Sequence, residues 1–305
     1  MNRIRIGTRG SALALAQTGW VKQKLEESHP GLTVETVTIK TSGDRFLDSP
    51  VQAIGGKGIF VKEIEEALLR KEIDLAVHSM KDLPTEIAPG LTIGAVPERE
   101  DPTDVLVSAG RILFKDLPAG ARVGTGSLRR KAQLLYHRPD LTVHPVRGNI
   151  DTRLAKLDRG EVDALVLAFA GLKRLGSESR IAEHLGAEVC LSAVAQGALA
   201  LECRRGDPVA SQVACLHHGS TALEVAAERA FLKRLGGGCH IPVGARAWTQ
   251  ADDIRILGMI ADGDGRKLFR GEVRGSSDEA EKLGRDLAER LLREGADRIL
   301  DVGNG

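Results

Sequence analysis

The fold is set by the opening stretch RIRIGTRGSALALAQTGWVKQKLEE, residues 3–27, in which a strand pattern passes directly into a helix pattern. RIRIG alternates charged and apolar side chains, as a half-buried strand does, and apolar residues then recur at helical spacing behind Ser11, a favourable N-cap. The same order continues with strand-like 33–39, helix-like 60–70 and the apolar run IDLAVHS, 73–79. This alternation predicts an α/β domain built on a parallel sheet.

The remainder of the chain predicts two further domains. PEREDPTD, residues 97–104, combines two prolines with dense charge and is typical of a linker. After it come strand-like 104–108, helix-like 128–138, strand-like 141–146, helix-like 149–160 and strand-like 163–168, which repeat the α/β pattern. A long helix from residue 220 then ends at three glycines, and three strands and an amphipathic helix follow. We therefore expect two α/β domains and a small α+β domain in 305 residues.

Composition excludes several classes of function. The 43 basic and 42 acidic side chains nearly cancel, and aromatic residues are only 3%, so neither a nucleic-acid surface nor a base-stacking platform is expected. The N-terminus lacks the apolar stretch of a signal peptide, and no apolar run approaches the roughly 18 residues that span a membrane. A cytoplasmic protein is expected. The four cysteines show no zinc-ligand spacing, which predicts neither a disulfide nor a metal site.

Two glycine-rich motifs resemble nucleotide-binding loops, but each lacks a residue that such a loop requires. GGKG at 55–58 has Gly58 where a phosphate loop requires Ser or Thr. GTGSLR at 124–129 has Arg129 where a dinucleotide fingerprint requires its third glycine. Neither motif supports nucleotide binding.

Basic and polar side chains recur where predicted strands end or predicted helices begin, which is where α/β proteins place ligand sites. Arginine offers a planar fork of donors suited to carboxylates, and free N–H groups at a helix N-terminus add to it. Any one of these arginines is equally well explained as a solvated residue, but their number predicts a small ligand with several carboxylates. The residues are Arg9, Ser11, Ser127, Arg129, Arg130, Arg147, Asn149 and Arg153.

HSMKD, residues 78–82, follows an apolar strand and precedes Pro84, so Lys81 and Asp82 are expected at the carboxyl end of a strand. A carboxylate there can stabilise a cation or move a proton, since opposite charges about 4 Å apart attract by roughly 4 kcal/mol at an effective dielectric near 20. A Lys–Asp surface pair is the alternative explanation. We expect His78 to be structural and hydrogen-bonded beneath the loop.

Cys239 lies in LGGGCHIPVG, where three glycines allow the backbone to approach a ligand closely. A thiol in such a loop can hold a covalent group. Taken alone, a loop cysteine is more often inert, and the adjacent His240 does not by itself make a nucleophile–base pair.

These segments together resemble the porphobilinogen deaminase (hydroxymethylbilane synthase) family over essentially the whole chain. The matching motifs are IGTRGSALALAQ, GGKGIFVKEIE, AVHSMKDLP, GTGSLRRKAQL, RGNIDTRL, AGLKRLG, AVAQGALALECR and GGGCHIPVGA. The resemblance implies a transferase of haem and related tetrapyrrole synthesis. It condenses four porphobilinogen molecules head to tail, releases ammonia each time, and liberates hydroxymethylbilane.

The resemblance also assigns the site. It implies a dipyrromethane cofactor, joined to Cys239 by a thioether and kept as a primer, and it makes Asp82 the carboxylate that steadies pyrrole nitrogens while the aminomethyl group leaves and a cationic azafulvene forms. Phe60 matches an aromatic of the active-site region, and Lys57 matches the family within a mobile loop at 41–58, in which Ala53 replaces a lysine of some members. The implied substrate and cofactor residues are Arg9, Ser11, Gln17, Lys57, Phe60, Ser79, Lys81, Thr125, Ser127, Arg129, Arg130, Arg147, Asn149, Arg153, Arg174 and Gln196.

The implied fold is two periplasmic-binding-protein-like α/β domains with a third small α+β domain. Its limits are residues 1–97 plus 193–216 for the first domain, 103–190 for the second and 219–305 for the third. Residues 97–103 and 190–197 would be the hinge strands, with the active site in the cleft between the larger domains. A monomer is expected, without nucleic-acid or membrane partners.

Two rival classes remain open. A non-enzymatic, two-lobed carboxylate-binding protein shares the arginines at strand ends, although it needs no tethered primer. A nucleic-acid binder would instead show steep salt dependence with oligonucleotides. A covalently bound pyrrole on the purified protein separates the enzyme from both.

Overall fold

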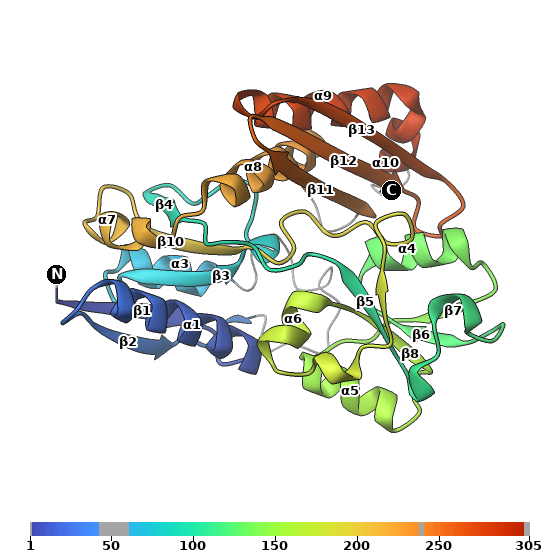
Figure 1. The fold of residues 1–305 in the computed structure, drawn as a ribbon, viewed down its shortest axis with the longest axis horizontal. Coiled ribbons are helices and arrows are strands. Elements are labelled where there is room, and N and C mark those ends of the chain that lie inside the picture. The colour runs from blue at the N-terminus through green and yellow to red at the C-terminus, as the bar shows by residue number, and fades with distance from the viewer. Residues whose placement is uncertain (1, 43–60, 238–240, 302–305) are drawn as a thin grey trace. The chain divides into compact units, whose positions relative to one another are not determined.

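The computed structural model describes residues 2–42, 61–237 and 241–301. By its internal contacts the chain divides into two compact units, coloured along the sequence in Figure 1. The first unit comprises Met1–Glu100 with Gly197–Ala222, and the second comprises Asp101–Gln196 with Leu223–Gly305.

The first unit is built on a five-stranded sheet with the order β2-β1-β3-β10-β4. Its strands are β1 (Arg3–Thr8), β2 (Thr33–Thr38), β3 (Leu75–Ser79), β4 (Leu91–Ala95) and β10 (Leu199–Arg204). Its helices are α1 (Ala12–Ser28), α3 (Lys62–Leu69) and α7 (Val209–Val213). β1 runs parallel to β2 and β3, whereas β10 runs antiparallel to β3 and β4. The expected parallel sheet is therefore wrong in one respect: β10 returns from a distant part of the sequence and enters in the opposite direction.

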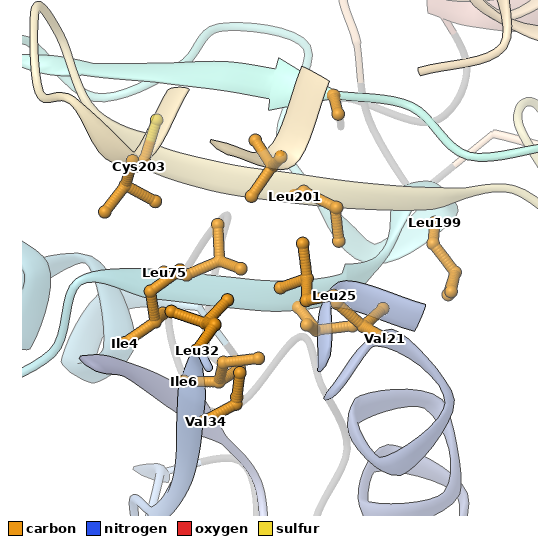
Figure 2. Packing of buried hydrophobic residues seen from close by; sticks show 14 residues of the cluster. Ile4, Ile6, Val21, Leu25, Leu32, Val34, Leu75, Leu199, Leu201 and Cys203 are labelled. Atoms are coloured by element: carbon orange, nitrogen blue, oxygen red, sulfur yellow. The ribbon is translucent and has the colours of Figure 1, made fainter. Parts of the chain in front are cut away.

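Each face of this sheet has its own apolar core. Figure 2 shows one of them, where Val21 and Leu25 of α1 meet side chains from β1, β3 and β10 such as Ile6, Leu75 and Leu201. The opposite face packs against α3 through a separate cluster. Because strand side chains alternate between faces, the register of β10 against β3 decides which of its residues lies under α3.

The second unit contains a similar five-stranded sheet with the order β7-β6-β8-β5-β9. Its strands are β5 (Asp104–Ser108), β6 (Arg122–Gly124), β7 (Thr142–His144), β8 (Ala164–Ala168) and β9 (Glu183–Leu185), and its helices are α4 (Leu128–His137), α5 (Ile150–Asp158) and α6 (Phe169–Arg174). β6 is parallel to β7 and β8, whereas β5 is antiparallel to β8 and β9. Both large sheets are thus mixed.

A third sheet completes the second unit. β11 (Val243–Gln250), β12 (Asp253–Ala261) and β13 (Leu268–Ser276) form an antiparallel meander covered by α9 (Ala280–Leu291), as Figure 1 shows. α8 (Gly219–Arg234) packs closely on α9, because a Cβ on Gly284 would lie 2.1 Å from the Ala227 carbonyl oxygen. The meander also joins the neighbouring α/β sheet through a buried cluster that includes Ala132 of α4 and Met259 of β12.

Short helical segments fill several connections. They are η2 (Met80–Asp82), η3 (Ala109–Arg111), η4 (Phe114–Asp116), η5 (Glu178–Arg180), η6 (Ala214–Leu216), η7 (Ser277–Glu279), η8 (Leu292–Ala296) and α10 (Asp297–Asp301). Together the three sheets confirm the predicted class of two α/β domains and one small α+β domain. The exact limits of three domains stay a prediction.

Candidate functional site

The turn that carries Asp82 is anchored within the first unit through Ser79 and Met80. β3 leads into η2, where the Met80 side chain is buried and its N–H donates to the Ala198 carbonyl at 3.0 Å. The Ser79 hydroxyl contacts the Gln17 amide, with Ser79 Oγ 2.8 Å from Gln17 Nε2. Lys81 and Asp82 themselves are exposed. This places Asp82 at the carboxyl end of a buried strand, on a turn fixed by its neighbours.

A buried hydrogen-bonded pair lies beneath this turn. His78 Nε2 is 2.9 Å from Oε2 of Glu202, and both side chains are almost completely excluded from solvent. This confirms the expectation that His78 is hydrogen-bonded and structural. Glu202 escaped the sequence analysis, although a charged residue inside the apolar run LALEC was a usable signal.

The N-terminus of α1 supplies another polar group of the first unit. Ser11 is its N-cap, and the hydroxyl accepts from the Ala14 N–H at 3.3 Å. Arg9, between β1 and this cap, is half-buried. Arg9 therefore lies beside a helix N-terminus, whose N–H groups and dipole favour an anion.

In the second unit, the loop after β6 brings Thr125, Ser127 and Arg130 together. Ser127 caps α4 by accepting from the Arg130 N–H, and its own N–H donates to the Thr125 hydroxyl at 3.2 Å. Gly126 approaches Val146 so closely that a Cβ would stand 3.0 Å from the Val146 carbonyl oxygen. The glycine in GTGS thus serves backbone packing, which agrees with the failure of the dinucleotide motif.

Arg129, Arg130 and Gln196 converge on a residue that the sequence analysis missed, Asp104. Arg129 Nη1 lies 2.6 Å from Asp104 Oδ2, and Arg130 donates from Nε and Nη2 to Oδ1 at 3.1 and 2.7 Å. Gln196 Nε2 reaches the same oxygen at 2.8 Å and the Pro102 carbonyl at 2.6 Å. These arginines do bind a carboxylate, as their chemistry predicted, but that carboxylate belongs to the protein.

The electrostatics of this cluster follow from its burial. Burial alone would raise the pKa of the Asp104 carboxyl, but attraction to Arg129 and Arg130 and their hydrogen bonds outweigh it and hold that pKa well below its usual range. Burial, followed by the nearby Asp104 charge, raises the pKa of the Cys190 thiol to about 12. Asp104 therefore stays ionised at neutral pH, and Cys190 stays a neutral thiol.

The segment between β7 and α5 holds the next group of predicted residues. Gly148 has φ 101°, a conformation suited to glycine, and its carbonyl accepts from Arg153 Nε at 2.8 Å. Asn149 is the N-cap position of α5. Arg147 and Arg153 are half-buried, as is Arg174 at the end of α6. These three arginines are more accessible than Arg129 and Arg130, which expose only 5% and 6% of their surface.

Several predicted features lie outside the described residues. They are Lys57, Phe60, Cys239 and all of the 41–58 loop except Thr41 and Ser42. Within residues 2–42, 61–237 and 241–301, no cluster of three His, Cys, Asp or Glu side chains could hold a metal ion. No helix in that part of the chain is long and apolar enough to cross a membrane.

The α/β sheets, with arginines and helix N-termini at their strand ends, define a class of protein suited to binding small polyanionic ligands. Comparison with known proteins identifies the family within this class. Residues 4–212 match the family described as "Porphobilinogen deaminase, dipyromethane cofactor binding domain", and residues 222–293 match "Porphobilinogen deaminase, C-terminal domain". The chain belongs to the porphobilinogen deaminase family.

Curated relatives agree with this assignment. The porphobilinogen deaminase of Pelobacter propionicus is 52% identical over 301 residues, covering 98% of this chain and 96% of the relative. That of Syntrophotalea carbinolica is 52% identical over 298 residues, covering 97% and 95%. Among solved structures, an ancestral cationic amino acid solute binding protein is 15% identical with a TM-score of 0.43, covering 70% of this chain and 86% of that chain.

Proposed function

We propose that this protein condenses four porphobilinogen molecules head to tail, releasing ammonia, on a dipyrromethane primer joined through a thioether to Cys239, and then releases hydroxymethylbilane. The observation that carries the proposal is the family match across nearly the whole chain, together with an exposed Asp82 on an anchored turn. The rival reading as a simple carboxylate-binding protein is not favoured by these relatives.

The described residues fit a group rich in acetate and propionate. The donor set consists of guanidinium groups and helix N-caps, which bind carboxylates, and contains no cluster of metal ligands among those residues. When bound, the dipyrromethane supplies the pyrrole end to which further units are joined. We assign its carboxylates, and those of the substrate, to the half-buried Arg9, Arg147, Arg153 and Arg174 and to Ser11 and Ser127 at their helix N-termini.

Arg129 and Arg130 have a different role in this proposal. Arg130 donates from all three guanidinium nitrogens to protein atoms, including the Val166 carbonyl at 3.0 Å. Their two positive charges meet one Asp104 charge, so the cluster keeps a net positive charge next to the Ser127 cap. They contribute local positive potential and hold α4 in place.

Asp82 is the proposed catalytic carboxylate. A carboxylate on a fixed turn can hold a developing cation or exchange a proton without reorganising, and such preorganised charge is worth several kcal/mol in a site from which bound substrate excludes water. Lys81 beside it offers a carboxylate-binding cation. The cytoplasmic location and the monomeric state expected from the sequence stay predictions.

The test begins with intact-protein mass spectrometry. Purified protein should carry the added mass of a two-pyrrole unit on the peptide that contains Cys239, and Cys239→Ser should lose both the added mass and activity. Asp82→Asn should keep the added mass and lower turnover at least about a hundredfold. An active preparation with unmodified Cys239, or near-normal turnover in Asp82→Asn, would contradict the corresponding assignment.

A further inference from the structure

Glu202 is an unusual residue for the middle of a sheet. It is fully buried on β10; its Oε2 pairs with His78, while its Oε1 has no hydrogen-bond partner among the described residues. A buried carboxylate that is only half compensated contributes little to stability and often opposes it. Its charge therefore points to a purpose other than holding the sheet together.

The strand that carries Glu202 is also the strand that anchors the Asp82 turn. In the register of β10 against β3, Ala200 lies opposite His78 and Leu199 opposite Ser79, and the Ala198 carbonyl receives the Met80 N–H. The His78–Glu202 hydrogen bond joins the side chains of the same two strands, two residues before the turn begins at Met80. The backbone that presents Asp82 is thus held from Glu202 through His78.

A third titratable group lies on the helix that covers this face. Glu65 of α3 has a raised pKa, first because of burial and second because of the Glu202 charge, while His78 acts in the opposite direction. Glu202 therefore interacts both with His78, on the strand leading to Asp82, and with Glu65, on the helix packed over that strand. Removing the Glu202 charge would change both interactions.

We propose that Glu202 is a positioning residue for the reaction: by holding the His78 ring, it fixes the backbone that carries Asp82. This inference rests on the proposed catalytic role of Asp82. It assigns Glu202 no contact with substrate, and it predicts a defect in turnover rather than in substrate binding.

The test uses Glu202→Gln and His78→Gln in the full-length, primer-loaded protein. We expect each to lower kcat at least about tenfold, with KM within about threefold of wild type, because substrate contacts are intact. The double variant should be no worse than the more severe single variant, since both break one interaction. Independently of activity, the Met80 and Leu83 amides should exchange hydrogen at least about tenfold faster in both variants. If Glu202→Gln does not fold, His78→Gln breaks the same hydrogen bond by changing the residue on β3 in place of the residue on β10.

Asp74→Asn is the matched control. Asp74 precedes β3 and is also a buried carboxylate, bonded to Arg5 at 2.9 Å and to Arg204 of β10 at 3.2 Å. Removing its charge should lower stability and leave kcat and the exchange of Met80 unchanged. An equal loss of kcat in Asp74→Asn, or additive effects of the two test variants, would reduce Glu202 to a packing role.

Asp82→Asn, measured in parallel, distinguishes a failure of the positioning role of Glu202 from a failure of the catalytic role of Asp82. Normal kcat in Glu202→Gln and His78→Gln beside an impaired Asp82→Asn overturns this inference alone. Near-normal turnover in Asp82→Asn overturns the catalytic assignment on which the inference depends.

Discussion

Each of the two units has a fully buried carboxylate on a strand of its large sheet, Asp104 on β5 and Glu202 on β10, and these two carboxylates have very different hydrogen-bond partners. Asp104 of β5 accepts from Arg129, Arg130 and Gln196. Glu202 of β10 accepts from His78 alone among the described residues. Asp104 is surrounded by donors from α4 and from the segment that precedes β10. Glu202 has the His78 ring as its hydrogen-bond partner and the like charge of Glu65 nearby.

The difference in hydrogen-bond partners also shows in the local electrostatics. At Asp104, the arginines overcome burial and lower the pKa of the carboxyl. Beside Glu202, the pKa of the Glu65 carboxyl is raised, first by the burial of Glu65 itself and then by the Glu202 charge, while His78 acts in the opposite direction. A buried carboxylate whose oxygens all have hydrogen-bond donors links the segments that supply those donors. A buried carboxylate with an oxygen that lacks a donor lowers the stability of the fold, so we interpret it as a residue kept for positioning or chemistry.

The largest effect is expected from Asp104→Asn. The amide would leave two buried guanidinium groups without their anion, and breaking a buried pair in this way costs about 3–5 kcal/mol. Urea unfolding should show this loss as a lower midpoint with little change in slope. A decrease in the free energy of unfolding below about 1 kcal/mol would mean that Asp104, like Glu202, contributes little to stability.

Asp163→Asn is the control for that measurement. Asp163 also forms an ion pair, with the single arginine Arg122 at 2.8 Å, but the Asp163 and Arg122 side chains are 40% and 42% exposed. Exposed pairs contribute about 0–1 kcal/mol, so this variant should unfold almost like wild type. The contrast would show that burial, and not the Asp–Arg pairing itself, makes Asp104 important.

The pH dependence of Asp104 follows from linkage. A carboxyl whose folded pKa is depressed stabilises the protein above its unfolded pKa, near 3.9, and this contribution is lost as pH falls toward the folded value. Wild-type stability should therefore drop below about pH 4. Asp104→Asn should lose part of that acid dependence, since it has no such group to protonate.

A smaller effect is expected from Gln196→Ala. This change removes one neutral donor from Asp104 Oδ1 and from the Pro102 carbonyl but leaves both arginines in place. Loss of a buried hydrogen-bond partner costs about 1–3 kcal/mol. We expect the urea midpoint of Gln196→Ala to lie between those of Asp104→Asn and Asp163→Asn. Such a result would show that the neutral donor Gln196 stabilises Asp104 less than the charged arginines do. A shift as large as that of Asp104→Asn would show that the stability contributed by Asp104 depends on Gln196 as much as on the arginines.

Much of this arrangement was predictable from the sequence, for local reasons. Helical spacing located α1 and α4, and the apolar run 73–79 located β3. The position directly after that buried strand located Asp82. The expected hydrogen bond of His78 followed from its burial in an apolar run. Each of these depends on neighbours within a few residues.

The buried carboxylates could not be found in the same way. Asp104 stands in a charged, proline-rich run that suggests an exposed linker, and its partners lie 25, 26 and 92 residues away. The partner of Glu202 is 124 residues away, across a strand whose direction the local pattern does not specify. Burial of a charge is decided by tertiary partners, so only the break in the apolar run at Glu202 gave any local signal.

The last and smallest effect concerns Glu65, and it tests whether the region around Glu202 really carries electrostatic cost. A carboxyl whose folded pKa is raised is most favourable to stability below its unfolded pKa, near 4.3, and this benefit is lost as pH rises through the folded value. Glu65→Gln should therefore raise Tm by about 1–3 °C at pH 7.5 and have almost no effect near pH 4. Glu66→Gln is the control, because the Glu66 side chain is 44% exposed and its ion pair with Arg70 is long, at 3.5 Å. This variant should not raise Tm at either pH. If the Glu202 charge is a cause, the gain from Glu65→Gln at pH 7.5 should shrink in a Glu202→Gln background, because the repulsion has already been removed. Equal stabilisation at both pH values, or a gain unaffected by Glu202→Gln, would show that Glu65 responds to burial alone and that the charge of Glu202 does not reach α3.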